Sequence, residues 1–145
     1  MHSLWTASLA CLFLLVGLGL IERMLKNRAR KAVPIRIHVN GTRGKTSVTR
    51  LIWSALREAG IPALAKTTGA APRLLFPDGS GRALSRKGKP NIREQLRTLW
   101  LAKRVGAKAL VIECMALAPD LQWASEHSMV QATIGVITNA RTDHT

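Results

Sequence analysis

The stretch HVNGTRGKTSVTRL at residues 38–51 constrains the fold of this chain more than any other. Two glycines, Gly41 and Gly44, flank a short polar run, and a lysine with two hydroxyl residues follows at once. The apolar pattern predicts a strand over residues 34–39 and a helix over residues 45–59. A glycine loop that follows a strand and opens a helix is typical of a phosphate-binding loop. The predicted helix has six apolar residues at helical spacing: Val48, Leu51, Ile52, Ala55, Leu56 and Ala59.

The spacing of this loop differs from the common G-x-x-x-x-G-K-[ST] pattern, which requires a glycine at position 39, where the chain has Val39. Glycines let backbone N–H groups approach phosphate oxygens closely, and the dipole of the following helix favours the same anion. We expect Lys45 to reach the terminal phosphates of a nucleotide and the Thr46 hydroxyl to bind Mg²⁺. The alternative is a turn and helix cap in which Lys45 is only solvated. The predicted phosphate-binding set is Gly41, Thr42, Arg43, Gly44, Lys45, Thr46 and Ser47.

The rest of the chain alternates between strand and helix patterns. Strands are expected over residues 62–68, 109–113 and 132–138, and a short helix over residues 119–127. Residues 69–90 predict a loop with a turn at Asp78-Gly79. The alternation predicts an α/β fold with a parallel, right-handed βαβ sheet and flanking helices. A further helix begins at Asn91, with Glu94 placed as in a capping box and an apolar face of Ile92, Leu96, Leu99 and Trp100.

The N-terminus predicts a separate element. Residues 4–21 are eighteen uncharged residues, enough for a helix of about 27 Å. Five basic residues follow it, so the positive-inside rule predicts a retained transmembrane helix with the N-terminus outside and residues 22 onward in the cytoplasm. A cleaved signal peptide and a buried soluble helix are the alternatives. We therefore expect a transmembrane anchor at 1–22, a basic juxtamembrane linker at 23–33 and a globular unit with the phosphate-binding loop at 34–145. The five basic residues are Arg23, Lys26, Arg28, Arg30 and Lys31, of which we expect Arg28, Arg30 and Lys31 to rest on anionic headgroups.

The net charge of +14 suits an anionic partner, which the charge alone leaves open between nucleotide, polyanion, lipid and nucleic acid. Four Trp and no Tyr give no indication of a stacking platform for nucleic acid, so no nucleic-acid partner is expected. Cys11 and Cys114 form neither a disulfide framework nor a metal-ligand spacing. The basic stretch RALSRKGKP at residues 82–90 is either a solvated loop or a path for a polyanionic product.

The loop NGTRGKTS resembles the N-G-T-x-G-K-[ST]-[ST] loop of the Mur ligase superfamily, a group of ATP-dependent amide ligases. The segments RIHVNGTRGKTSVTRLI, AKTTGAAPR, KPNIREQ, VIECMALAPDLQ and GVITNARTDH resemble, in this order, the membrane-bound poly-γ-glutamate synthase branch. The resemblance covers nearly the whole chain. The loop is specific to the superfamily, whereas KTTG, NIREQ and ECMA carry the branch assignment.

The resemblance implies ATP and Mg²⁺ as cofactors and places two further metal-associated residues, Glu113 and His144. Glu113 ends an apolar strand, at the edge where α/β sheets bind ligands, and its alternative role is a solvent-facing or capping carboxylate. Asn139 and Asp143 lie in the same stretch as His144. Thr67 and Thr68 are candidates for contact with the transferred phosphate, with a plain β-turn as the alternative.

The implied reaction joins glutamate units into poly-γ-glutamate through an acyl phosphate, with partners in the membrane lipids and in other subunits of a synthesis and export complex. The location implied is the cytoplasmic membrane. Alternatives are a membrane-anchored P-loop ATPase or kinase, another Mur-type ligase such as a folylpolyglutamate-synthase-like enzyme, and a non-enzymatic basic membrane module. Because the superfamily continues beyond the motif that ends this chain, we also expect an N-terminal piece of the central ATPase domain, inactive and poorly folded by itself.

Overall fold

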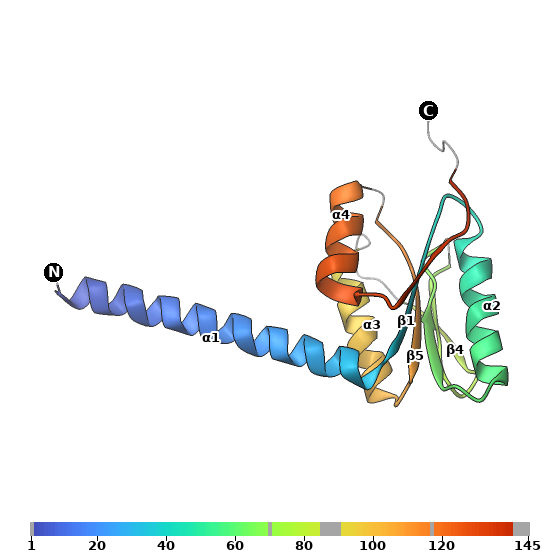
Figure 1. The fold of residues 1–145 in the computed structure, drawn as a ribbon, viewed down its shortest axis with the longest axis horizontal. Helices are drawn as coiled ribbons and strands as arrows, with labels where there is room; N and C mark the ends of the chain where they lie inside the picture. Colours follow the sequence, from blue (N-terminus) through green and yellow to red (C-terminus); the bar gives the residue numbers. More distant parts are fainter. Residues whose placement is uncertain (1, 70, 85–90, 117, 141–145) are drawn as a thin grey trace.

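The computed structural model describes residues 2–69, 71–84, 91–116 and 118–140, with only the backbone at residues 2–4. It shows an α/β unit built on one sheet, from which a long N-terminal helix extends (Figure 1). The elements are α1 (His2–Ala32), β1 (Ile35–Asn40), α2 (Lys45–Glu58), β2 (Ala63–Lys66), β3 (Arg73–Leu75), β4 (Gly81–Ala83), α3 (Arg93–Arg104), β5 (Ala109–Glu113), α4 (Pro119–Ala124), the π-helix η1 (Ser125–Val130) and β6 (Ile134–Ile137).

The sheet has the strand order β4-β3-β2-β5-β1-β6, and its four strands from β2 to β6 are parallel. The predicted α/β class is thereby confirmed. The parallel strands end at one edge, where Val39 pairs with Glu113, Lys66 with Ile112 and Asn40 with Ile137. The loops that follow these strands therefore meet at the carboxyl edge, where α/β proteins bind ligands.

The segment 69–90 is not the plain loop that its composition predicts, because β3 and β4 form an antiparallel hairpin beside β2. Each of these strands has only three residues, which is too short for a periodic pattern to appear in the sequence. The predicted turn at Asp78-Gly79 is confirmed. Gly79 has a positive φ of 93°, and the Ser80 amide and hydroxyl both donate to Asp78 Oδ1 at 2.9 and 2.7 Å.

Two apolar clusters lie on the two faces of the sheet, and the alternation of residues along β5 assigns them. Val111 packs with Trp53 of α2 on one face, and Ile112 packs with Leu99 of α3 on the other. Figure 1 shows α2 on one side of the sheet and α3, α4 and the base of α1 on the opposite side. All five residues of β5 are buried, as the continuous apolar run predicts for a central parallel strand.

The apolar spacing predicts part of the buried faces of α2 and α3, since Val48, Ile52 and Leu56 of α2 and Leu96 and Leu99 of α3 pack against the core. In α2 the buried residues are Thr49 and Trp53, whereas Leu51 is 69% exposed. Trp53 fixes this orientation, because its indole N–H donates to the carbonyl of Ala63 at 3.0 Å. In α3 the predicted Leu99 is buried but Trp100 is 44% exposed. The buried face of α3 is completed by polar residues, which an apolar pattern does not detect: Gln95 and Thr98.

The helix α1 is the one element of the described residues that is long and apolar enough, by length and composition, to cross a membrane. It does not end with the apolar run at residue 21 but continues through the basic residues to Ala32. Its last turn enters the core, where Ala29 and Val33 are buried with Leu99 and Ala102. Arg30 is also buried, 9% exposed, so the expectation that it rests on lipid headgroups is wrong.

The base of α1 is held by two arginines that donate to backbone carbonyls. Arg30 donates to Ser128 O at 2.7 Å and to Met129 O at 3.1 Å, both at the end of η1. Arg36 of β1 donates to the carbonyl of Val33, the residue after α1, at 2.8 Å. Its Nε donates to the carbonyls of Val130 and Gln131 at 3.1 and 3.0 Å. The two guanidinium groups thus satisfy carbonyls that helix ends leave without partners, and they join α1, β1 and η1.

Candidate nucleotide and metal site

The loop between β1 and α2 has the backbone shape that its glycines predict. Gly41 has φ 128° and Gly44 has φ 80°, both in the region that favours glycine. A side chain at Gly41 would collide with the Thr138 hydroxyl and with Asn139, whose carbonyl oxygen would lie 2.9 Å from the added Cβ. No such barrier exists at Gly44, which faces open space. The close approach of the backbone to residues 138 and 139 therefore requires glycine at position 41.

Asn139, which follows β6, holds the loop from the other side. Its carbonyl accepts the Thr42 amide at 3.2 Å, and its side chain both accepts the Arg43 amide at 3.1 Å and donates to the Arg43 carbonyl at 3.0 Å. The Thr138 hydroxyl donates to the same carbonyl at 2.7 Å. The amides of Thr42 and Arg43, which we expected to bind phosphate, thus take part in shaping the loop.

The helix α2 begins at Lys45 and directs its N-terminus toward the same loop. Its N-cap residue is Gly44, which has no side chain to occupy the first-turn amides. Amides in a first helical turn have no partner within the helix, and the helix dipole adds positive potential. Lys45 folds over the loop, where its ammonium donates to the Gly41 carbonyl at 2.6 Å and to the Thr42 carbonyl at 3.2 Å. Ser47 lies exposed in the same first turn.

Glu113, the last residue of β5, brings a carboxylate to this helix end. It is 3% exposed, and both its oxygens lie 3.1 Å from the Thr46 hydroxyl. The Thr68 amide donates to Glu113 Oε2 at 2.6 Å. A carboxylate beside a hydroxyl oxygen is the donor type that Mg²⁺ prefers, so Thr46 and Glu113 fit this ion. Within the described part of the chain they are not joined by a cluster of three or more His, Cys, Asp or Glu side chains.

The two threonines proposed for substrate contact are used differently. The Thr67 side chain is part of the hairpin connection, because its hydroxyl oxygen accepts the Arg73 amide at 3.0 Å. Thr68 lies at the site through its backbone, which binds Glu113. His144 and Asp143 lie outside the described residues, as does most of the basic stretch at 82–90.

Lys66 joins the three motifs KTTG, NIREQ and ECMA in one buried network that the sequence analysis did not detect. Its side chain is fully buried and pairs with Glu94 Oε2 at 3.0 Å. It also lies 3.3 Å from Gln95 Oε1 and 3.6 Å from the sulfur of Met115. Gln95 in turn donates to the backbone carbonyl of Glu113 at 3.2 Å. The network therefore supports the end of β5, directly behind the candidate metal ligand.

A second group lies behind the loop on the α4 side. Gln122 of α4 accepts the Asn40 side-chain amide at 3.1 Å, and Asn40 Oδ1 accepts the Gly41 amide at 2.8 Å. His38, for which the sequence indicated no partner, pairs with Glu126 at 2.8 Å, and the His127 ring stacks on Trp123. No pattern in the sequence indicates the Asn40–Gln122 and His38–Glu126 contacts, because each joins segments more than 80 residues apart.

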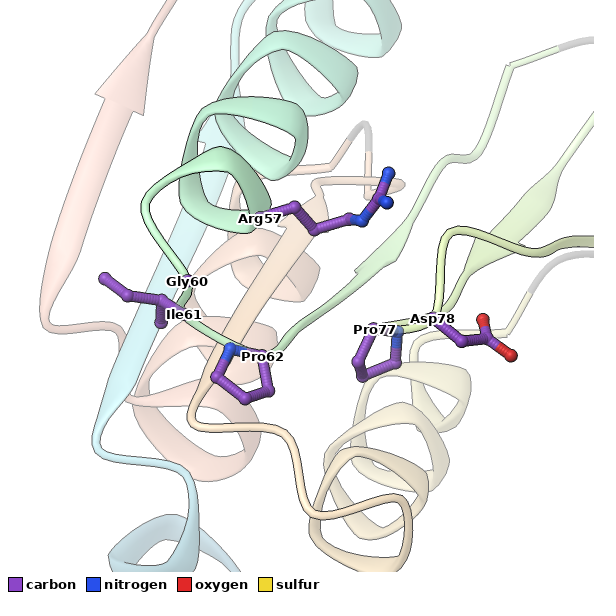
Figure 2. A pocket seen from close by; sticks show the side chains of 6 residues that line it. All are labelled: Arg57, Gly60, Ile61, Pro62, Pro77 and Asp78. Carbon is purple, nitrogen blue, oxygen red and sulfur yellow. The ribbon is translucent and has the colours of Figure 1, made fainter.

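A pocket of about 420 Å³ lies away from this site, between the end of α2 and the β3–β4 turn (Figure 2). Three of its lining residues come directly before β2, so the pocket lies at the amino edge of the sheet, whereas the glycine loop lies at the carboxyl edge. The lining residues are Arg57, Gly60, Ile61, Pro62, Pro77 and Asp78. None of them belongs to the predicted phosphate-binding or metal-binding set, so the pocket is separate from the candidate site.

The chain has a glycine loop at the carboxyl edge of a parallel sheet, a lysine and a threonine at the next helix, and a carboxylate on the neighbouring strand, an arrangement typical of α/β proteins that bind phosphate. The chain belongs to the Mur ligase family: the Mur ligase middle domain matches residues 39–145.

Two curated relatives are similar to nearly the whole chain. The "Capsule biosynthesis protein CapB" of Bacillus anthracis is 40% identical over 136 residues, which are 92% of this chain and 29% of that protein. The "PGA synthase CapB" of Bacillus subtilis (strain 168) is 39% identical over 143 residues, 97% of this chain and 36% of that protein. The chain thus spans about a third of the length of these relatives. No solved structure matches it.

Proposed function

We propose that this chain is the phosphate-binding part of an ATP-dependent amide ligase that polymerises glutamate into poly-γ-glutamate. The observation that carries the proposal is the meeting of Thr46, at the N-terminus of α2, with the buried carboxylate of Glu113 at 3.1 Å, beside the loop that bears Lys45. Family membership supports the ligase chemistry, and the names of the two relatives support the polymer and its use in a capsule.

The roles of the residues follow from their chemistry. The loop and the first-turn amides of α2 bind the phosphates of ATP, and the Lys45 ammonium offsets the negative charge on the transferring group. Thr46 and Glu113 would hold Mg²⁺, which would supply positive charge to offset that of the phosphate oxygens. Asn139 and Thr138 keep the loop in the shape that this binding requires. The assignments of His144 to the metal and of Thr68 to the substrate remain proposals.

The proposed reaction has two steps. A glutamate γ-carboxylate oxygen forms a bond to the γ-phosphorus of ATP while the bond from that phosphorus to ADP breaks, which gives an acyl phosphate and ADP. The amine of the next glutamate then attacks the acyl carbon, loses a proton and expels phosphate, leaving an amide bond. The phosphoryl transfer needs positioning and charge stabilisation rather than covalent help from the protein, and Lys45 with the helix N-terminus provides both.

The proposed location is the cytoplasmic membrane, with α1 as a single transmembrane helix and the N-terminus outside. The uncharged residues 4–21 match the thickness of a bilayer, and the basic residues after them favour the cytoplasm for the rest of the chain. ATP is available on that side. Membrane lipids and other membrane subunits that handle the polymer are the proposed partners.

The proposal is tested with a protein of the relatives' full length that contains this chain, by measuring glutamate-dependent ADP release and polymer formation. Lys45→Ala is expected to lower both rates about 1,000-fold or more, because it removes a charge that acts on the transferring phosphoryl group. Lys108→Ala is the matched control, since Lys108 is exposed at the opposite edge of the sheet before β5. Its rates are expected to equal those of the parent protein.

Near-normal polymer formation by Lys45→Ala would contradict the assignment of the loop. ATP hydrolysis that is independent of glutamate and yields no amide product would contradict the ligase assignment and favour a P-loop ATPase.

A further inference from the structure

The outer face of α3 carries a stripe of arginines around one tryptophan. Arg93, Arg97, Trp100 and Arg104 follow one another at spacings of four, three and four residues, which places them along one face of the helix. All four are exposed. The residues that α3 buries against the sheet are Gln95, Thr98, Leu99 and Ala102, on the opposite side of the helix. The four exposed residues, hereafter the α3 stripe, therefore point away from the sheet.

The direction in which the α3 stripe points is also the direction in which α1 leaves the protein. Figure 1 shows α3 and the base of α1 on the same side of the sheet, with α1 running outward at a steep angle to α3. The two helices are in contact, since Ala29 and Val33 share a core with Leu99 and Ala102. A bilayer crossed by α1 would accordingly lie over the outer face of α3.

The distance between the α3 stripe and such a bilayer follows from helix geometry. The uncharged run ends at residue 21, and α1 reaches its contact with α3 at Ala29, eight residues later, or about 12 Å along the helix. The side chains of α3 extend about 5–6 Å from its axis toward the membrane. The remaining gap of about 6 Å equals the thickness of one headgroup layer, which is about 5–8 Å.

We propose that the α3 stripe docks on the anionic headgroups of the bilayer that α1 crosses. The three guanidinium groups are complementary to lipid phosphates, and a tryptophan between them suits the headgroup level, where Trp is enriched. The stripe takes the role that the sequence had assigned to Arg30, which is buried in the protein. This inference rests on the proposed insertion of α1, and it adds a second, lateral contact that fixes how the α/β unit lies on the membrane.

The experiment uses a protein of the relatives' full length that contains this chain, in nanodiscs of phosphatidylcholine alone or mixed with phosphatidylglycerol, with a fluorescence quencher attached to a lipid headgroup. The signal of Trp100 is the difference between the parent chain and Trp100→Phe. We expect this signal to be quenched strongly when phosphatidylglycerol is present and weakly when it is absent or when the salt concentration is high.

Two variants with the same loss of charge separate the α3 stripe from the general basic character of the chain. Arg97→Gln removes the central arginine of the stripe, whereas Arg50→Gln removes an exposed arginine of α2, on the other side of the sheet. Arg97→Gln is expected to weaken docking about fivefold, which corresponds to about 1 kcal/mol for one arginine near an anionic membrane. Arg50→Gln is expected to leave docking unchanged.

Carbonate extraction measures insertion independently. If the chain stays in the membrane but the Trp100 signal is equally unquenched in both lipid mixtures, docking of the α3 stripe is refuted while the anchor stands. If the signal changes on addition of poly-γ-glutamate and not with phosphatidylglycerol, the stripe binds polymer and the lipid assignment is refuted. If carbonate removes the chain, the inference fails together with the proposed anchor.

Discussion

Among single residues, Lys66 is the one whose environment differs most from what its side chain normally requires. A fully buried ammonium must be paired and hydrogen-bonded, and Glu94, Gln95 and Met115 surround it. Removal of one member of a buried ion pair leaves an uncompensated charge, which makes such pairs costly to break even where they add little net stability.

We therefore expect Lys66→Met to lower the free energy of unfolding by about 3 kcal/mol, because it leaves the partly exposed Glu94 carboxylate without its ammonium partner. Denaturant unfolding, in detergent, of a protein of the relatives' full length that contains this chain measures this loss. The double variant Lys66→Met/Glu94→Gln is expected to be more stable than the sum of the two single losses predicts, since no charge then remains. Strictly additive losses would show that the two side chains do not interact.

For single residues, the sequence predicted the side chains of the candidate site but not the residues that hold them in place. Lys45, Thr46 and Glu113 were selected because a loop motif and a strand end are local features, and the structure brings these residues together. The roles of Asn139, Lys66 and Gln95 depend on contacts across 18 to 96 residues, which no spacing in the sequence encodes. A polar residue on the buried face of a helix, such as Gln95, is the only local signal that such a network leaves.

Among the elements, η1 is a π-helix rather than an α-helix, and arginines from two other elements bind its end. It ends at Gln131, a non-glycine residue with a positive φ of 47°, and Arg30 and Arg36 bind its final carbonyls. Burial lowers the pKa of Arg36, and the Glu126 carboxylate opposes this effect. The guanidinium group thus stays charged while it serves two helix ends at once.

Arg36→Lys should loosen this junction although it keeps the charge, because one ammonium cannot donate to carbonyls of both η1 and the base of α1. We expect amide exchange in residues 125–130 to become about 30-fold faster, as the loss of about 2 kcal/mol in charged hydrogen bonds predicts. Hydrogen exchange followed by mass spectrometry measures this rate. Arg50→Lys on the exposed face of α2 serves as the control, and unchanged protection of η1 in Arg36→Lys would contradict the role of Arg36.

Elements with strong local signals were predictable, and those that depend on tertiary pairing were not. The strands β1, β2, β5 and β6 and the helix α2 follow from hydrophobic runs and the glycine loop, which are strong local signals. The hairpin of β3 and β4 and the division of residues 119–130 into α4 and η1 arise from tertiary pairing, which overrides weak propensity. The apolar face predicted for α2 is confirmed at Val48, Ile52 and Leu56, whereas Leu51 is exposed and Trp53, held by its hydrogen bond to Ala63, is buried in its place.

For the whole molecule, the proposed topology can be tested with thiol labelling, because the native cysteines interfere little. Cys114 is buried and its pKa is raised by that burial, so it stays a thiol at neutral pH, and Cys11 lies within the uncharged run. In intact cells, a membrane-impermeant maleimide is expected to label the Ser3→Cys variant. The Ser54→Cys variant, whose position is exposed on α2, is expected to be labelled only after the membrane is opened. The reverse pattern would overturn both the orientation and a cytosolic source of ATP.

The burial of the end of α1 has a mechanical consequence for a protein of this architecture. A flexible tether would let the α/β unit tumble beneath the membrane. Here α1 ends inside the core, where Arg30 binds η1 and Arg36 binds the carbonyl that follows α1, so α1 and the α/β unit move as one rigid body. The tilt of such a helix is set by bilayer thickness and by the helices that pack against it. With the proposed insertion of α1, a change in that tilt would also turn the carboxyl edge of the sheet, and the glycine loop with it, relative to the membrane surface.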